Sequence, residues 1–297
     1  IIIDEQHKFG VNQRKELSEK GGIDCDVLVM SATPIPRTMM MTIYGDMDVT
    51  LIKEKPKNRK PIKTYSKLDE KIIEVISFVK KEIKNGNQIF WVCPLIDDSS
   101  RIEHESVKNK YLFLSKYFKN RIGLIYGSMD KQIKEQVLDS FLNKKIDLLI
   151  STTVIEVGID FPDANVVIIE NSNKYGLSQL HQLRGRVGRG SKDAYCILMF
   201  KSNLSDNAKK RIKILKSSND GFKISEEDMK LRGYGDILGF KQSGLKKFRL
   251  ADPIIHKDLF KLAELEVKKL ENNEIEFGKF NKLLKLYDKA SIINEVV

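Results

Sequence analysis

Cysteine and histidine are scarce in this chain of 297 residues, which contains three of the former and four of the latter. Cys25, Cys93 and Cys196 lie far apart, and no set of these residue types has the spacing of metal ligands. A zinc site built from sequence neighbours is therefore excluded. We expect reduced, inert thiols of the kind found in cytoplasmic proteins.

Long hydrophobic runs and a secretory leader are also absent from the sequence. No apolar run approaches the ~20 residues that a membrane helix needs, and the chain begins on an apolar strand rather than on a basic leader segment. We expect no membrane partner. Apolar residues make up 41% of the chain, enough for a substantial core, and the length suits about two domains of ~150 residues.

Negative charge is the minority sign, since 52 lysines and arginines face 41 acidic residues and the net charge is +11. Such an excess suits a polyanionic partner, although solubility alone could account for it. Basic residues gather at 53–63 and again at 240–249. The first stretch contains two prolines and is interpreted as a solvated linker between domains.

Short apolar runs that alternate with helical patterns predict an α/β fold. Strands are expected at 1–4, 26–31, 88–96, 122–127, 146–152, 164–170 and 193–200. Helices are expected at 69–86, 105–120 and 130–145, and another begins within 177–189. This order favours a largely parallel sheet with helices on both faces. After residue 201 the pattern becomes mostly helical, at 206–218, from 225 into a glycine-rich loop, and from 253 onward.

Two carboxylates, Asp4 and Glu5, directly follow the first apolar strand. In nucleotide hydrolysis such a pair divides the work: one acid orients Mg²⁺ and its waters, and the other polarises the attacking water. Adjacent acids are also common by chance, and a capped strand end is the alternative.

Small hydroxyl residues end two further strands. Residues 31–38, SATPIPRT, join such a strand end to two prolines, which gives a stiff segment suited to transmitting movement. Ser151, Thr152 and Thr153 can donate to phosphate oxygens. Gly158 and Asp160 then offer a flexible backbone and an acceptor for a ribose hydroxyl. Ordinary turns and loop caps are the alternative for both segments.

Three arginines, Arg184, Arg186 and Arg189, lie on or beside one short predicted helix. Arg186 and Arg189 are three residues apart and share a face if that segment is helical. Like charges packed together are costly without an anion between them. An arginine pair that reaches a transferring γ-phosphoryl group is worth ~10³–10⁵ in rate. A solvated basic helix is the weaker alternative, because the flanks are apolar and rich in glycine.

Four segments in chain order resemble motifs II, III, V and VI of the superfamily 2 helicases: DEQH at 4–7, SAT at 31–33, 151–160 and 182–189. Residues 228–244 are similar to the translocation motif shared by the RecG family and the transcription-repair coupling factors. The glutamine in DEQH and the sequence RLADP at 249–253 favour the RecG family. The resemblance thins after about residue 265.

The resemblance implies two RecA-like lobes with ATP and Mg²⁺ in the cleft between them. Residues 1–55 would be the end of the first lobe, 56–205 the second lobe, and 206–297 a translocation hairpin with C-terminal helices. By similarity, Asp4 would hold Mg²⁺ through water and Glu5 would activate the attacking water. Coupling between the lobes would fall to Gln6, His7, Ser31 and Thr33.

The same resemblance assigns roles in the second lobe. Gly158 and Asp160 would contact the nucleotide. The γ-phosphate would be sensed and stabilised by Gln182, Arg186 and Arg189. Thr152 or Thr153 would touch the DNA backbone, and Arg232 and Gln242 would convert lobe closure into movement along DNA.

One departure from the family pattern matters. The phosphate loop G-x-x-x-x-G-K-[ST] occurs nowhere, and the one Gly-Lys pair, Gly278-Lys279, is followed by phenylalanine. We therefore expect the chain to be the C-terminal part of a longer protein, and by itself neither to bind ATP tightly nor to hydrolyse it.

The resulting hypothesis is part of a monomeric, ATP-dependent helicase that remodels branched or duplex DNA, such as replication forks and Holliday junctions, at the bacterial nucleoid. Two alternatives remain open. One is a translocase like the transcription-repair coupling factors, and the other is a non-catalytic module that binds nucleic acid.

Overall fold

The structure, a computed structural model, describes residues 1–5, 20–22, 25–31, 49–52, 54, 56, 59–94, 100–152, 161–232 and 256–271. The chain divides into two compact units. The first contains residues 1–35 and 50–233, and the second contains residues 36–49 and 234–297. Among the described helices, none combines the length and the apolar character that crossing a membrane requires.

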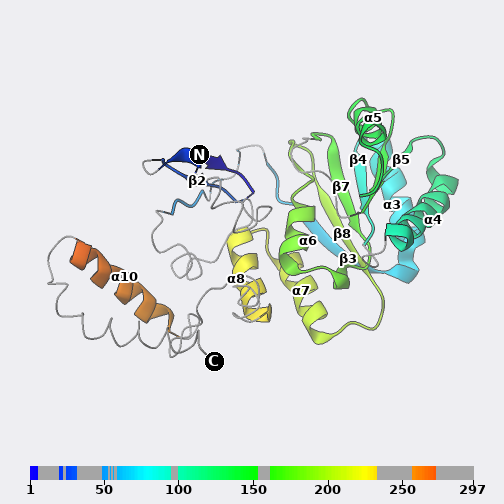
Figure 1. Cartoon of the computed structure of the whole chain (residues 1–297). Helices are drawn as coiled ribbons and strands as arrows, with labels where there is room; N and C mark the ends of the chain where they lie inside the picture. Colours follow the sequence, from blue (N-terminus) through cyan, green and yellow to red (C-terminus); the bar gives the residue numbers. More distant parts are fainter. Residues whose placement is uncertain are drawn as a thin grey trace. The chain divides into compact units, whose positions relative to one another are not determined.

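A six-stranded sheet dominates the first unit (Figure 1). Its strands, in chain order, are β3 (Lys63–Leu68), β4 (Gln88–Val92), β5 (Ile122–Ile125), β6 (Leu148–Ser151), β7 (Ala164–Ile169) and β8 (Tyr195–Phe200). In the sheet they follow the order β3-β8-β7-β4-β6-β5, and every pairing is parallel. The predicted parallel α/β architecture is confirmed.

Helices cover both faces of this sheet. They are α3 (Ile72–Lys84), α4 (Ser100–Phe118), α5 (Lys131–Leu142), α6 (Leu177–Arg184), α7 (Asp206–Ser217) and α8 (Gly221–Arg232). Two short 3-10 turns, η2 (Asp69–Lys71) and η3 (Ser172–Lys174), precede α3 and α6. Parallel strands need a crossover between them, and here the crossovers bring the helices onto the sheet.

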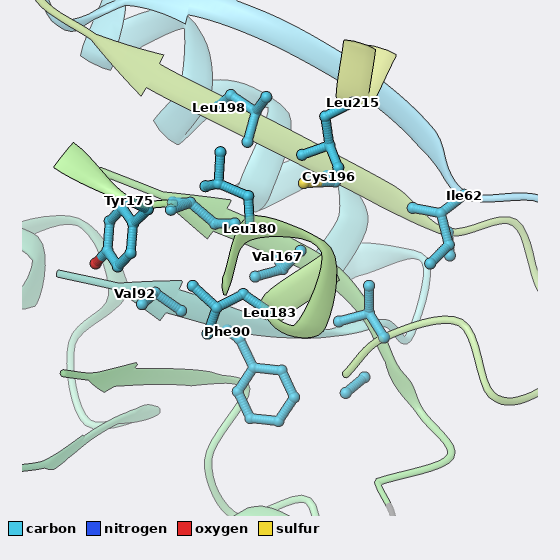
Figure 2. Packing of buried hydrophobic residues seen from close by; sticks show 14 of the residues in the cluster. Ile62, Phe90, Val92, Val167, Tyr175, Leu180, Leu183, Cys196, Leu198 and Leu215 are labelled. Carbon is cyan, nitrogen blue, oxygen red and sulfur yellow. The ribbon is translucent and has the colours of Figure 1, made fainter. Parts of the chain in front are cut away.

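Alternation along each strand creates two separate cores. On β4, Ile89 and Trp91 pack in a cluster with residues of α3 and α4. Phe90 and Val92 point to the other face, into a cluster with residues of α5, α6 and α7 (Figure 2). All four side chains are fully buried. Burial of an apolar side chain of this size contributes about 1.5–3 kcal/mol, so both faces hold the sheet firmly.

Two helices begin at polar side chains that cap free backbone amides. Asp130 accepts hydrogen bonds from the amides of Gln132 and Ile133 at the start of α5, at 2.8 and 3.4 Å. Ser205 accepts one from the amide of Ala208 at the start of α7, at 3.3 Å. Such caps each contribute ~1 kcal/mol and fix where the helix begins.

A second, two-stranded sheet pairs β1 (Ile2–Ile3) with β2 (Leu28–Val29) in parallel. The amide of Leu28 donates to the carbonyl of Ile1, and that of Met30 donates to the carbonyl of Ile3, both at 2.8 Å. The strands predicted at 1–4 and 26–31 are thus confirmed. In the second unit, α10 (Lys257–Glu271) agrees with the helical pattern expected from residue 253.

The structure differs from the sequence prediction at three elements. The edge strand β3 was not predicted, because its sequence, KTYSKL, carries two lysines and lacks an apolar run. The helix expected at 105–120 begins earlier, at Ser100. The helix expected within 177–189 ends at Arg184, because Gly185 closes it and Gly188 has a φ of 68° that a helix does not allow.

Candidate functional site

The first strand places Asp4 and Glu5 just past its end. Ile3 is buried and anchors the strand, whereas Asp4 is exposed. The amide of Glu5 donates to Oδ1 of Asp4 at 2.8 Å, and Glu5 has a φ of 50°. A non-glycine residue in this left-handed region is uncommon, and such strain gathers at functional sites. Lys119, Lys144 and Asn171 share this backbone conformation, so it does not by itself identify the acidic pair as functional.

A turn of residues 185–190, here called the arginine turn, carries Arg186 and Arg189. Both lie beyond α6, beside the helix rather than on it, so the condition for sharing a helix face is not met. The turn is fixed by Val187, which is fully buried in the core, and by the amide of Gly188, which donates to Ala164 at 3.1 Å. Arg186 is left half-buried and Arg189 is exposed.

Only glycine fits at position 188. Its φ of 68° lies in the left-handed region, and an added Cβ would stand 2.6 Å from the Cβ of Ala194. The close approach lets the turn lie flat against the start of β8. The spacing of the two arginines is therefore set by the core beneath them rather than by helical geometry.

The electrostatics of the arginine turn link it to the acidic pair. Burial lowers the pKa of the Arg186 guanidinium, the charge of Arg189 lowers it further, and the carboxylate of Glu5 raises it. Glu5 and Arg186 are 181 positions apart in the sequence, yet the Glu5 carboxylate raises the pKa of Arg186. Two neighbouring guanidiniums with one carboxylate near them suit a polyphosphate bound with a divalent cation.

These residues fit the chemistry of Mg²⁺-ATP. Magnesium is held by one or two carboxylates together with substrate phosphates and waters rather than by a protein cage. The described residues include no group of three or more histidine, cysteine or acidic side chains placed to hold a metal. Asp4 is the exposed carboxylate at the end of β1, and it is the candidate for that role.

Arg184, the first arginine of the motif, points the other way. Its side chain is 2% exposed, and burial lowers its pKa. Nη1 donates to the carbonyls of Leu215 and Ser218 at 2.7 and 2.9 Å, and Nη2 lies 3.1 Å from Nδ1 of His181. Arg184 therefore binds α6 to the end of α7 and is not available to a ligand.

A second contact joins α6 to α8. The hydroxyl of Ser178 donates to Oδ2 of Asp228 at 2.5 Å. Gln182, on the same helix, is half-buried. Arg232, a predicted translocation residue, is the last residue of α8, and α6 contacts this helix. The motif VI segment and the start of the predicted translocation segment are thus packed together.

The carboxyl ends of the central strands form a third region. Ser151 and Thr152 are each 1% exposed, and within the described residues their hydroxyls have no hydrogen-bond partner. Nearby, Glu170 accepts from Nε1 of Trp91 at 2.7 Å and pairs with Nζ of Lys110 at 2.7 Å. Sequence analysis indicated Thr152 but not Glu170. The pattern that could have indicated Glu170 is an acidic residue directly after an apolar strand.

Several predicted residues lie outside the described part of the chain. They are Gln6, His7, Thr33, Thr153, Gly158, Asp160 and Gln242. Ser31 is described and lies just after β2. Among the predicted residues that the structure describes, Glu5 and Arg189 both act on the pKa of Arg186. Asp4 adjoins Glu5, and Gln182 lies four residues before Arg186.

Two protein family profiles match the chain. The Helicase conserved C-terminal domain matches residues 69–191. The profile described as ATP-dependent DNA helicase RecG, domain 3, C-terminal, matches residues 218–284. The two regions contain most of the six-stranded sheet, the arginine turn, α8 and α10.

Curated relatives show the same likeness over most of the chain. The ATP-dependent DNA helicase RecG of Bacillus subtilis is 45% identical over 256 residues, which is 86% of this chain and 37% of that protein. The RecG of Thermotoga maritima is 44% identical over 288 residues, 96% of this chain and 37% of that protein. The chain thus spans little more than a third of the length of these relatives.

A solved structure agrees in fold. A RecG structure bound to a three-way DNA junction superimposes with a TM-score of 0.67 and 44% sequence identity, and the match covers 87% of this chain and 33% of that one. The expected RecA-like helicase lobe, followed by a helical C-terminal segment, is confirmed.

Proposed function

This chain belongs to the RecG family of DNA helicases, as its C-terminal helicase region, and we propose that it forms part of the ATP-driven motor of a helicase that remodels branched DNA. Residues 56–205 form the second motor lobe, residues 1–55 are the end of the first lobe, and residues 206–297 carry the translocation hairpin and C-terminal helices. The RecG domain 3 match at 218–284 favours this family over the transcription-repair coupling factors.

One observation supports the motor proposal above the others. The half-buried Arg186 lies beside the like charge of Arg189 and within electrostatic reach of Glu5. Acid and arginines come from distant parts of the chain, as a site between two lobes requires. A purely structural turn has no need of two guanidiniums that raise each other's energy.

Each residue then has a task at a bound nucleotide, which supplies the phosphoanhydride whose cleavage drives movement. Asp4 would hold Mg²⁺ through water, and a Glu5 carboxylate oxygen would accept a proton from the attacking water. Arg186 and Arg189 bind the negative charge that grows on the γ-phosphoryl oxygens, and Gln182 orients that group. Gly158 and Asp160 contact the nucleotide from the second lobe.

Coupling residues carry the consequence of hydrolysis to DNA. Gln6, His7, Ser31 and Thr33 link the site to the other lobe. Thr153 donates to a DNA phosphate, whereas the hydroxyl of Thr152, the other candidate, is buried in the structure. Arg232 and Gln242 convert lobe closure into movement. The net charge of +11 favours the polyanionic track, and the relative that was solved with a three-way junction supports branched DNA as the substrate.

The proposal places a monomer at the nucleoid in the bacterial cytoplasm, joined to the upstream part of the same protein. Since the chain contains no phosphate loop, the 297 residues alone are proposed to have no DNA-stimulated ATPase activity. Turnover by this chain alone would contradict that part of the proposal.

The test uses the full-length protein. Arg186→Ala should lower the DNA-stimulated ATPase rate by about 10³-fold or more, because the transition-state charge loses its partner. Arg121→Ala, whose side chain is 57% exposed and pairs with Asp147, is the matched control and should leave the rate unchanged. If Arg186→Ala retained the ATPase rate of the unaltered protein, the motor proposal would fail in favour of a non-catalytic docking module.

A further inference from the structure

The end of the basic linker, residues 53–63, lies against the arginine turn. Arg59 is half-buried, although a solvated linker was expected. Its Nε donates to the carbonyl of Gly188 at 3.2 Å, and its Nη2 donates to the carbonyl of Gly185 at 3.3 Å. These two carbonyls lie on either side of Arg186, so one guanidinium spans the segment that carries the predicted γ-phosphate contacts.

The neighbours of Arg59 hold this arrangement in place. Its own amide donates to the carbonyl of Pro56 at 3.0 Å. Lys60 and Lys63 each donate to a carboxylate oxygen of Asp193 at 2.8 Å, and the amide of Lys63 donates to Ala194 at 2.9 Å. The linker is thus attached just before β3, through Lys60, and at the first residue of β3, Lys63.

These attachments differ in what they can control. The side chains of the two lysines are 54% and 50% exposed and pair with Asp193, which lies beyond the arginine turn. Arg59, by contrast, donates to two carbonyls of the turn itself. A planar guanidinium presents its donors in a fixed fork, so binding two carbonyls at once fixes their separation and direction.

The charge of Arg59 indicates that its contact with the arginine turn does more than attach β3. Arg59 brings a guanidinium to a turn that already carries Arg186 and Arg189, and there it donates to the carbonyls of Gly185 and Gly188. Structural attachment of β3 could use an uncharged donor, whereas a charged fork at this position also adds to the positive field that faces an anion.

We propose that Arg59 is a positioning residue for ATP hydrolysis: it holds the arginine turn so that Arg186 and Arg189 meet the γ-phosphoryl group, and it ties that turn to the linker between the lobes. This role rests on the proposed motor function. It adds to that function, because the linker must move whenever the two lobes change position. Through Arg59 the same linker holds the turn that carries Arg186 and Arg189, the residues proposed to stabilise the transition state.

The test compares three variants of the full-length protein at saturating branched DNA. Arg59→Ala removes the fork, Arg59→Lys keeps the charge without the fork, and Lys60→Ala is a neighbouring basic control whose side chain pairs with Asp193 instead. The measurements are kcat and KM for ATP, the affinity for ADP alone, and the affinity for ADP with aluminium fluoride, which mimics the transferring phosphoryl group.

Arg59→Ala should lower kcat by about 10- to 100-fold with KM changed less than about twofold, because a displacement of ~1 Å at the reacting groups costs up to ~10² in rate. Affinity for ADP with aluminium fluoride should fall by a similar factor, and affinity for ADP alone should not. Arg59→Lys should restore little of the kcat that Arg59→Ala loses. Lys60→Ala should have the same kcat as the unaltered protein.

The outcomes separate this inference from the proposed function. Absence of DNA-stimulated ATPase in the unaltered protein would remove the motor function itself. An active protein whose Arg59→Ala variant keeps its kcat would overturn the positioning role alone. Equal losses of ADP and ADP–aluminium fluoride affinity would also overturn it. If Arg59→Ala does not fold, Arg59→Lys decides: an unchanged kcat refutes the role, and a lowered kcat with intact ADP binding supports it.

Discussion

Arg184→Met should destabilise the second lobe strongly without touching the predicted nucleotide site. The methionine keeps most of the apolar stem and removes the guanidinium. The carbonyls of Leu215 and Ser218 then lose a charged donor at 2.7 and 2.9 Å in a buried setting. These carbonyls lie at the C-terminal end of α7, where a positive charge is favourable.

The size of the effect follows from these contacts. A hydrogen bond from a charged group contributes ~1.5–3 kcal/mol, so two of them suggest about 3–6 kcal/mol. Against this stands the cost of burying the guanidinium, which lowers the pKa of Arg184 and which methionine avoids. The expected net loss is about 3 kcal/mol, a large share of the ~5–15 kcal/mol that stabilises a typical domain.

Urea denaturation of the 297-residue chain measures this loss. Trp91 is the single tryptophan and is fully buried in the sheet, so its fluorescence reports unfolding of this lobe. With a slope of about 2 kcal/mol per M, the midpoint should fall by about 1.5 M. Lys67→Met, which breaks a pair with Glu74 that is exposed on both sides, should cost only about 0–1 kcal/mol. Equal effects of the two substitutions would refute the assignment of Arg184 as a structural anchor.

Two further predictions concern titration and thiol chemistry. Two lysines lower the pKa of Asp193 from 3.8 to about 2, so the unfolded chain takes up this proton first and stability is lost as the pH falls through that range. Asp193→Asn should flatten the pH dependence of the unfolding free energy between these values, and an unchanged slope in this variant would contradict the prediction. Burial raises the pKa of the Cys93 thiol well above its ordinary value and that of Cys196 to about 12. Ellman's reagent should therefore modify only the half-buried Cys25 rapidly in the native chain, and a second fast thiol would contradict this.

The fold was predictable where a strand is buried on both faces. The apolar runs at 88–92, 148–151 and 164–169 lie in the middle of the sheet, and their helices carry a clear periodicity. The edge strand β3 was missed because one of its sides meets solvent and its lysines break the apolar pattern. Helix ends were less certain, since the end of α6 depends on how Gly188 packs against Ala194.

The candidate site was predictable as a set of residue types but not as a geometry. Sequence order indicated the acids and the arginines, and the structure places the charges of Glu5 and Arg186 within reach of each other. It also separates Arg184 from the pair that it precedes, because only burial distinguishes one arginine of this motif from the next. Arg59 was expected to be solvated, since no local pattern shows that a linker residue meets carbonyls about 130 positions away.

The strand order has a consequence for synthesis. β3 is the first strand of the large sheet to leave the ribosome, yet its single partner in that sheet is β8, the last. Lys63 pairs with Tyr195, about 130 residues later. At ~5–20 residues per second, β3 waits roughly 10 s for its partner. During that interval the strands from β4 to β7 can assemble with one another. Arg59 can bind the arginine turn only after Gly185 and Gly188 have been made, about 126 to 129 positions later, so we expect an incomplete chain to form much of its core before it can position the residues proposed to cleave ATP.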